Sequence, residues 1–139
     1  ISDGVVTGRH ATSRYAQYLG VPVTGGRGAT VVSAGTVSSA DLASPSGHPV
    51  IEVVAFSSPN VDDLTGDIGS EIRLAYLHRP GAEVRPIKGG AVAGNVFEAF
   101  QTARLSSDIH QTLVGGFGDG GTYIGPRAVR FDRLRVAGD

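Results

Sequence analysis

The sequence predicts an α+β domain, built mainly of antiparallel β-sheet with two or three short helices. About six or seven short segments show the alternating or β-branched pattern of strands, and the few helical segments do not alternate regularly with them. The 21 glycines among 139 residues occur in pairs and short runs, which indicates many tight turns. Residues 1–139 are therefore predicted to form a single domain.

The first predicted helix covers residues 10–19 and is followed by Gly20 and Pro22, residues that commonly end a helix. A glycine-rich loop at 25–28 then leads to a β-branched segment, 29–34, that is predicted as a strand. The helix is predicted from four apolar residues that recur on one of its faces: Ala11, Tyr15, Tyr18 and Leu19.

A second short helix is predicted at 38–42, where a serine cap precedes it and Pro45 and Gly47 end it. Residues 50–56 form the strongest strand candidate, and Pro59-Asn60 marks a turn.

A half-buried strand is predicted around Ile72, Leu74 and Tyr76, which alternate with Glu71, Arg73 and Ala75. The turn residues at 79–82 precede an extended segment at 84–92, so the two segments are predicted to form a hairpin.

The step Gly94-Asn95 follows an apolar strand and precedes an amphipathic segment, which predicts a tight turn and a helix capped by Asn95. Arg104 is expected in the last turn of this helix, near the negative end of its dipole. The helix is expected to bury Val96, Phe97, Phe100 and Ala103.

Late strands are predicted at 123–124 and 129–136, with a bulge or bend near Asp132-Arg133 where the alternation breaks. The core candidates in the last strand are Val129, Phe131, Leu134 and Val136.

Composition excludes several classes of protein. The net charge of −1 gives no general attraction for nucleic acid, and no apolar run approaches the roughly 20 residues that cross a bilayer, so neither partner is expected. The chain has no cysteine, which fits a reducing compartment, and we expect a cytoplasmic protein. The chain begins at Ile1 and contains no methionine, so we expect it to be part of a longer polypeptide.

No catalytic motif accompanies these elements. The four histidines are far apart in the sequence, and the carboxylates Asp62, Asp63 and Asp67 occupy a polar loop rather than an EF-hand spacing. The glycine-rich run 115–121 precedes a strand rather than a helix, so we expect a mobile loop over a groove and not a phosphate site. No G-x-S-x-G motif is present, and we assign no catalytic or metal-binding residue to the chain.

Four segments, in order along nearly the whole chain, resemble the C-terminal half of the TldD/PmbA family of metallopeptidase-related proteins. They are Asp3-Gly4-Val5 with Ser13–Ala16 and Leu19–Gly25, then Thr65–Ile68, then Arg85–Lys88 through Gly94-Asn95, and finally Leu134–Asp139.

The resemblance implies that zinc is a candidate cofactor of the parent assembly and not of this chain. Family peptidases hold zinc with an H-E-x-x-x-H helix upstream of this region and a cysteine from the C-terminal half. We would expect that cysteine near Leu113, in the segment 111–118, and none is present. The chain therefore resembles the non-catalytic partner type, which pairs with a homologous active subunit and with its own upstream N-terminal half.

The resulting prediction is a domain that contributes to a peptide-processing assembly by shaping the substrate groove and the subunit interface. Thr65, Asp67 and Asn95 are the candidate substrate-binding residues. The simpler interpretations are a structural turn for the segment 65–67 and a helix cap for Asn95. Two alternatives stay open: a non-catalytic binding or scaffold module, and a diverged zinc peptidase with ligands outside this chain. The chain shows no self-contained active site, so we expect hydrolase activity only as part of a larger assembly.

Overall fold

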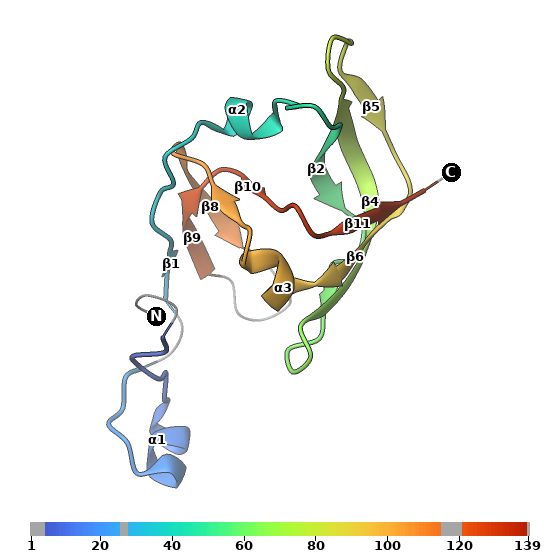
Figure 1. Cartoon of the computed structure of the whole chain (residues 1–139). Coiled ribbons are helices and arrows are strands. Elements are labelled where there is room, and N and C mark those ends of the chain that lie inside the picture. Colours follow the sequence, from blue (N-terminus) through green and yellow to red (C-terminus); the bar gives the residue numbers. More distant parts are fainter. Residues whose placement is uncertain (1–4, 26–27, 115–120, 139) are drawn as a thin grey trace. The chain divides into compact units, whose positions relative to one another are not determined.

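The structure, a computed structural model, describes residues 5–25, 28–114 and 121–138 and divides into two compact units (Figure 1). The smaller unit combines Ile1–Val32 with His110–Gly125, and the larger unit combines Ser33–Ile109 with Pro126–Asp139. Strands predominate among the described residues, and the three helices found there are short, which confirms the predicted α+β class.

In the smaller unit, helix α1 (Ser13–Leu19) ends where the sequence predicts. Gly20 adopts a left-handed conformation with φ 63°, and its N–H donates to the Ala16 carbonyl. The helix begins later than predicted because Ala11 is held in a loop. The Ala11 N–H donates to Thr24 Oγ1 at 2.8 Å, and the Thr24 N–H donates to the Ala11 carbonyl at 3.0 Å.

The sheet of the smaller unit has three strands in the order β1-β9-β8. Strand β1 (Thr30–Val31) runs parallel to β9 (Gly121–Pro126), and β8 (Ile109–Val114) lies on the other side of β9. The strands predicted at 29–34 and 123–124 are confirmed, the first as a shorter element. Of the loop predicted at 115–121, all but Gly121 lies outside the described residues.

In the larger unit, helix α2 (Ser39–Ala43) has the predicted serine cap. Ser38 Oγ accepts the Asp41 N–H at 3.1 Å and so satisfies a backbone donor that the first turn leaves free. Beyond this helix, β7 (Arg104–Leu105) and β10 (Val129–Arg130) form a separate antiparallel pair.

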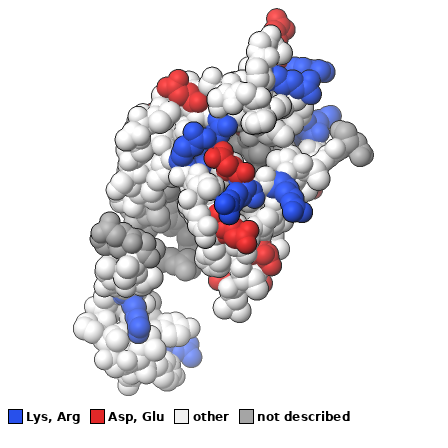
Figure 2. Space-filling view, viewed as in Figure 1, with Lys and Arg blue, Asp and Glu red and all other residues white. Residues whose placement is uncertain are grey.

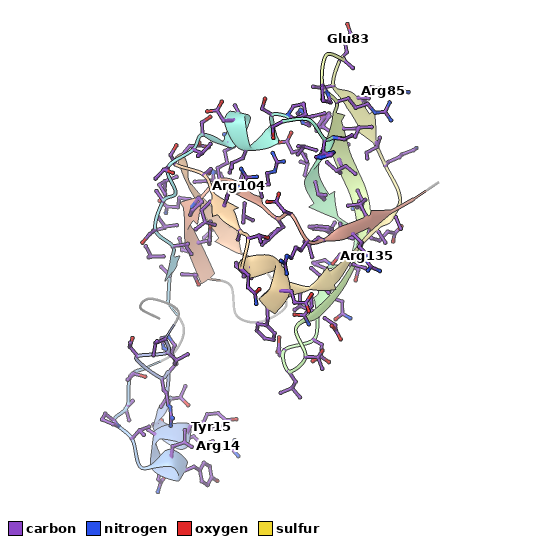
Figure 3. The ribbon with its side chains drawn as sticks, in the orientation of Figure 1. Arg14, Tyr15, Glu83, Arg85, Arg104 and Arg135 are labelled. Atoms are coloured by element: carbon purple, nitrogen blue, oxygen red, sulfur yellow. The ribbon has the colours of Figure 1, made fainter. Side chains whose placement is uncertain are left out.

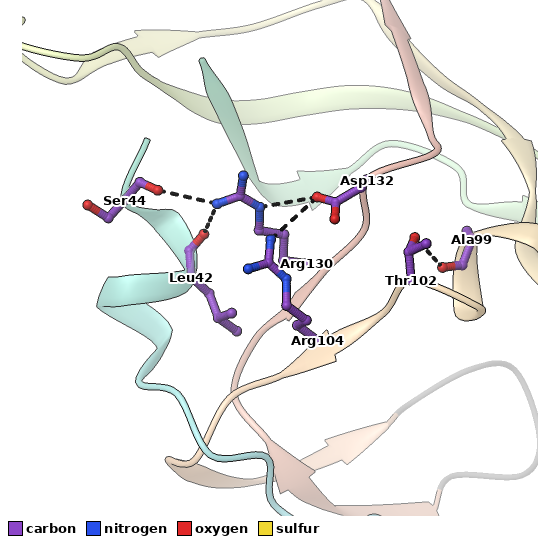
Figure 4. A network of polar contacts seen from close by, with 7 residues as sticks. All are labelled: Leu42, Ser44, Ala99, Thr102, Arg104, Arg130 and Asp132. Carbon is purple, nitrogen blue, oxygen red and sulfur yellow. Dashed lines mark hydrogen bonds and ion pairs between the residues drawn. The ribbon is translucent and has the colours of Figure 1, made fainter. Parts of the chain in front are cut away.

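Arg130 connects this strand pair to α2 (Figure 4). Its guanidinium donates to the carbonyls of Leu42 and Ser44 at 3.1 and 3.2 Å, where the end of a short helix leaves carbonyl groups without helical partners. Asp132 forms ion pairs with both Arg130 and Arg104 at 3.5 Å. These contacts hold α2 against the C-terminal part of the chain.

The main sheet of the larger unit is antiparallel and is centred on β4 (Asp67–His78). The first half of β4 pairs with β3 and β6, and its second half pairs with β2 and β5. Strand β11 pairs with β6 and forms an outer edge, so the predicted hairpin around residues 79–82 is confirmed within a larger sheet. The bounds are β2 Val50–Phe56, β3 Asn60–Val61, β5 Arg85–Ile87, β6 Ala91–Asn95 and β11 Arg135–Ala137.

The core of the larger unit is formed by Ile72, Ala75 and Val92. The prediction that Tyr76 shares a face with Ile72 is wrong, because Tyr76 is 36% exposed whereas Ala75 is fully buried. The register between β2 and β4 shifts on either side of Ala55, so the inward positions of β4 change phase between Ile72 and Ala75. Four partly buried residues pack against this core: Ile51, Val53, Ile87 and Leu134.

Helix α3 (Val96–Phe100) follows Asn95 as predicted, but its length and its buried side differ from the prediction. Phe97 and Phe100 are 59% and 61% exposed, and Ala99 is the buried residue. A helix of five residues places only a narrow side against the sheet, so most of the expected apolar face stays in solvent. Arg104 lies on β7 and not in the last turn of the helix.

The C-terminal segment shows the predicted bend at residues 132–133. Phe131 and Leu134 are half-buried, whereas Val129 and Val136 are 42% and 41% exposed. The prediction of Val129 and Val136 as core residues is therefore wrong. Among the described strands, β10, which carries Val129, pairs with β7 alone, and β11, which carries Val136, is an edge strand next to β6.

Candidate functional site

The three predicted groove residues, Thr65, Asp67 and Asn95, lie together where β4 begins and β6 ends. Asp67 is directly opposite Asn95 in the antiparallel pair. Asn95 Nδ2 donates to the Thr65 carbonyl at 2.7 Å and to Asp67 Oδ1 at 3.1 Å. The Asp67 N–H donates to Thr65 Oγ1 at 3.3 Å. Residues from two distant segments thus form one hydrogen-bonded junction.

Asn95 also caps α3, as the sequence predicts. Its Oδ1 accepts the N–H groups of Phe97 and Glu98 at 3.0 and 3.4 Å, while its own backbone is extended. One end of the amide therefore accepts from the helix and the other end donates to the loop, which an aspartate or serine could not do equally. The side chain of Asn95 has a complete structural role, and contact with substrate stays a prediction.

Glycines at two positions allow the chain to pass through this junction. Gly66 has φ 76°, and a Cβ there would lie 2.5 Å from the Phe97 ring. Gly94 has φ 156°, and a Cβ there would lie 2.9 Å from Leu134 Cδ2. Both positions combine a backbone conformation that favours glycine with a close neighbour, so larger residues would displace the junction.

Asp62 shapes the turn that carries Thr65. Its Oδ1 accepts the backbone N–H groups of Leu64 and Thr65 at 2.9 and 2.8 Å. These bonds, the one from Thr65 first, lower the pKa of the Asp62 carboxyl below its ordinary value because they favour the charged form. The predicted turn interpretation of this loop is supported by these contacts.

A shallow, open groove of about 370 Å³ begins at the junction, and we call it the Asp67 groove. Thr65 supports the junction but does not line the groove. Arg135 lies at the outer edge of the main sheet, where β11 adjoins β6 (Figure 3). The groove is lined by Asp67, Ala93, Gly94, Asn95, Glu98, Arg133 and Arg135.

Glu98, Arg133 and Arg135 were missed as groove residues by sequence reasoning. The two arginines belong to the densest basic group in the chain, but nothing in the sequence pairs that segment with β6. The register that places Arg135 opposite Ala93 is what brings them to the groove.

The groove combines two carboxylates with two guanidinium groups. The side chains of Arg133 and Arg135 form no ion pair with another described residue, in contrast to Arg104 and Arg130. Charged groups of both signs next to a sheet edge can bind the polar main chain and the charged side chains of a peptide. The described lining residues include no Ser, Cys or His, and their charged and amide side chains are groups that can bind a peptide.

The described residues do not fit a zinc site. They contain no group of three His, Cys, Asp or Glu side chains close enough to hold a metal ion. The chain also contains no cysteine. Across the same described ranges, no helix is long and apolar enough to cross a membrane.

Comparison with known proteins gave one family. Residues 1–138 match the family model of the PmbA/TldA metallopeptidase C-terminal domain. No curated protein matches the chain.

Proposed function

Since the chain belongs to the PmbA/TldA metallopeptidase family, whose C-terminal domain it matches, we propose that it contributes to a peptide-processing assembly. It lines part of the substrate groove and provides a subunit interface. The zinc centre of this assembly is supplied by residues outside the chain. Its partners are the upstream N-terminal half of the same polypeptide and a homologous subunit, in the cytoplasm.

The Asp67 groove next to the outer edge of β11 is the observation that supports this proposal most strongly. Strand β11 is the terminal strand of its sheet, with β6 as its neighbour. The backbone N–H and C=O groups on the outer side of an edge strand can bind an extended peptide as an additional strand. A peptide bound there would lie next to Arg135, which both belongs to β11 and lines the groove.

Helix α1 supports the interface part of the proposal. Tyr15, Tyr18 and Leu19, which form most of the predicted apolar stripe, are 60%, 74% and 56% exposed. Tyr15 projects from the helix in Figure 3. Among the described residues 5–25, the buried ones are the small residues Ala11 and Ala16. Large apolar residues grouped on one surface are typical of protein interfaces.

The proposal is tested with the full-length parent protein, purified with and without a homologous subunit of the same family. The readout is cleavage of an unstructured fluorogenic peptide. We expect cleavage only with the complete assembly, and no cleavage of the same peptide when alternate backbone amides are N-methylated, because methylation removes the donors needed for strand addition.

Two results would overturn the proposal. Absence of cleavage with every family partner would favour a binding or scaffold module. Stoichiometric zinc bound to the present chain alone would favour a zinc peptidase that uses residues of this chain.

A further inference from the structure

A second groove lies at the opposite end of β11 and is larger than the Asp67 groove, at about 590 Å³. We call it the β5 groove because Arg85 and Ile87 of β5 line it. Its apolar lining includes Ile51 and Leu77, which are directly opposite each other on β2 and β4. Leu77 is in turn directly opposite Arg85 on β5. The row of cross-strand neighbours therefore runs from the apolar residues Ile51 and Leu77 to the positively charged Arg85.

The charges of the β5 groove have one sign. Arg79, Arg85 and Lys88 line it, and none of its described lining residues is a carboxylate. The side chains of these three residues form no ion pair with another described residue. Glu83 is the acidic residue at the hairpin tip beside Arg85 (Figure 3). It is not part of the lining.

The positive charge of this groove contrasts with the Asp67 groove, which is lined by Asp67 and Glu98 as well as by two arginines. The chain as a whole has a net charge of −1. Across the face seen in Figure 2, basic and acidic side chains are mostly interspersed. A cationic, partly apolar groove in a chain with no net positive charge is complementary to a ligand that carries both carboxylates and apolar groups.

Strand β11 connects the two grooves. Arg135 lines the Asp67 groove, and Val136 and Ala137 line the β5 groove. Since successive side chains of a strand point to opposite faces, Arg135 and Val136 lie on opposite faces of the sheet. A peptide added along β11 would present its side chains to the two faces in alternation.

We propose that the β5 groove selects acidic peptide substrates: an extended substrate added along β11 places Asp or Glu side chains against Arg79, Arg85 and Lys88. This inference rests on the proposed function, because it names the substrate class of the same assembly. A polypeptide is favoured over a free phosphate because the apolar row and the strand edge contact groups that phosphate lacks.

The test uses the full-length parent assembly with a chelator present, so that binding is measured without cleavage. Fluorescence anisotropy compares an extended peptide of alternating Glu and Val with the isosteric Gln and Val peptide. We expect the acidic peptide to bind roughly tenfold to a hundredfold more tightly, as the loss of three exposed ion pairs implies. The difference should shrink at high salt.

Two triple variants assign the effect to the groove. Arg79→Gln, Arg85→Gln and Lys88→Gln together should abolish the preference for the acidic peptide. The charge-matched control combines Arg9→Gln, Arg14→Gln and Arg73→Gln, none of which lines the groove, and it should keep the preference. An equal loss in both triple variants would show a net-charge effect and overturn the inference, as would equal binding of the Glu and Gln peptides.

Inorganic phosphate is then tested as a competitor of the acidic peptide. Full displacement of the acidic peptide by phosphate at an equal concentration would identify a phosphate site and overturn the peptide proposal. Cleavage of the Gln and Glu peptides is then measured without chelator. If the Glu and Gln peptides bind equally and are cleaved equally, the preference for acidic peptides is wrong but the peptidase role is not. If the Glu peptide binds selectively and no peptide is cleaved, the peptidase role is wrong.

Discussion

Asn95 Nδ2 lies 3.1 Å from Asp67 Oδ1, and these two residues are the last opposed pair of strands β4 and β6. The bond closes the strand pair at the point where α3 begins. Because the same amide accepts two N–H groups of the helix, the strand end and the helix start depend on one side chain.

Replacing Asn95 with Ala should lower the free energy of unfolding by about 0.5–2 kcal/mol, because the cap of α3 is lost. Asn95→Ser should cost less, since its hydroxyl can still accept from the helix, although the bonds to Thr65 and Asp67 would be lost. Urea denaturation measures both. Asn60→Ala is the matched control, since the Asn60 side chain makes no hydrogen bond to a described residue. If Asn95→Ala lowers the free energy of unfolding no more than Asn60→Ala does, the role of Asn95 as the cap of α3 is contradicted.

Gly94→Val should lower the free energy of unfolding by more than Asn95→Ala, by at least about 2 kcal/mol. The positive φ of 156° is unfavourable for valine, and its side chain would collide with Leu134. Thermal denaturation of Gly69→Val provides the comparison, because nothing lies within 4 Å of a Cβ at Gly69. Similar effects at the two glycines would show that Gly94 is not constrained as described.

Part of the stability should be lost in acid through Asp62. Its pKa is lowered in the folded chain, so this stabilisation is complete above the ordinary pKa of 3.8 and is lost as the pH falls through the lower folded value. Asp62→Asn should therefore flatten the pH dependence of unfolding below about 3.8. Asp63→Asn is the neighbouring control. Identical acid profiles for both variants and the unmodified chain would rule out this contribution.

Tyr18→Ser should weaken association with the partner subunit while leaving the free energy of unfolding nearly unchanged, because Tyr18 is 74% exposed. Size-exclusion chromatography of the full-length parent mixed with its partner measures the fraction of the complex that dissociates. Tyr76→Ser, a less exposed tyrosine of the larger unit, should leave association intact. Unchanged association of Tyr18→Ser would show that the α1 stripe lies outside the interface.

Features that depend on neighbouring residues could be predicted from the sequence. The bounds of β2, the Ser38 cap and the Asn95 cap follow from β-branched runs and from side chains that bond to nearby backbone groups. The candidate substrate-binding residues Thr65, Asp67 and Asn95 lie at one hydrogen-bonded junction, and Asp67 and Asn95 line the groove, but their contact with substrate stays a prediction.

Features that depend on strand pairing could not be predicted. The exposure of Tyr76 follows from register shifts between β2 and β4, which no local pattern records. The exposure of Phe97 follows from the shortness of α3, whose buried residue is Ala99. Arg135 lines the groove because β11 pairs with β6.

We propose that the Asp67 groove beside β11 contacts the peptide substrate. Steady-state peptide hydrolysis by the full-length parent assembly, with Arg135→Ala and with Arg73→Ala as the exposed control outside both grooves, tests it most directly. We predict that Arg135→Ala raises KM roughly threefold to tenfold with kcat unchanged, because a binding contact is removed, and that Arg73→Ala changes neither. The same KM for Arg135→Ala as for the unmodified assembly would contradict the claim.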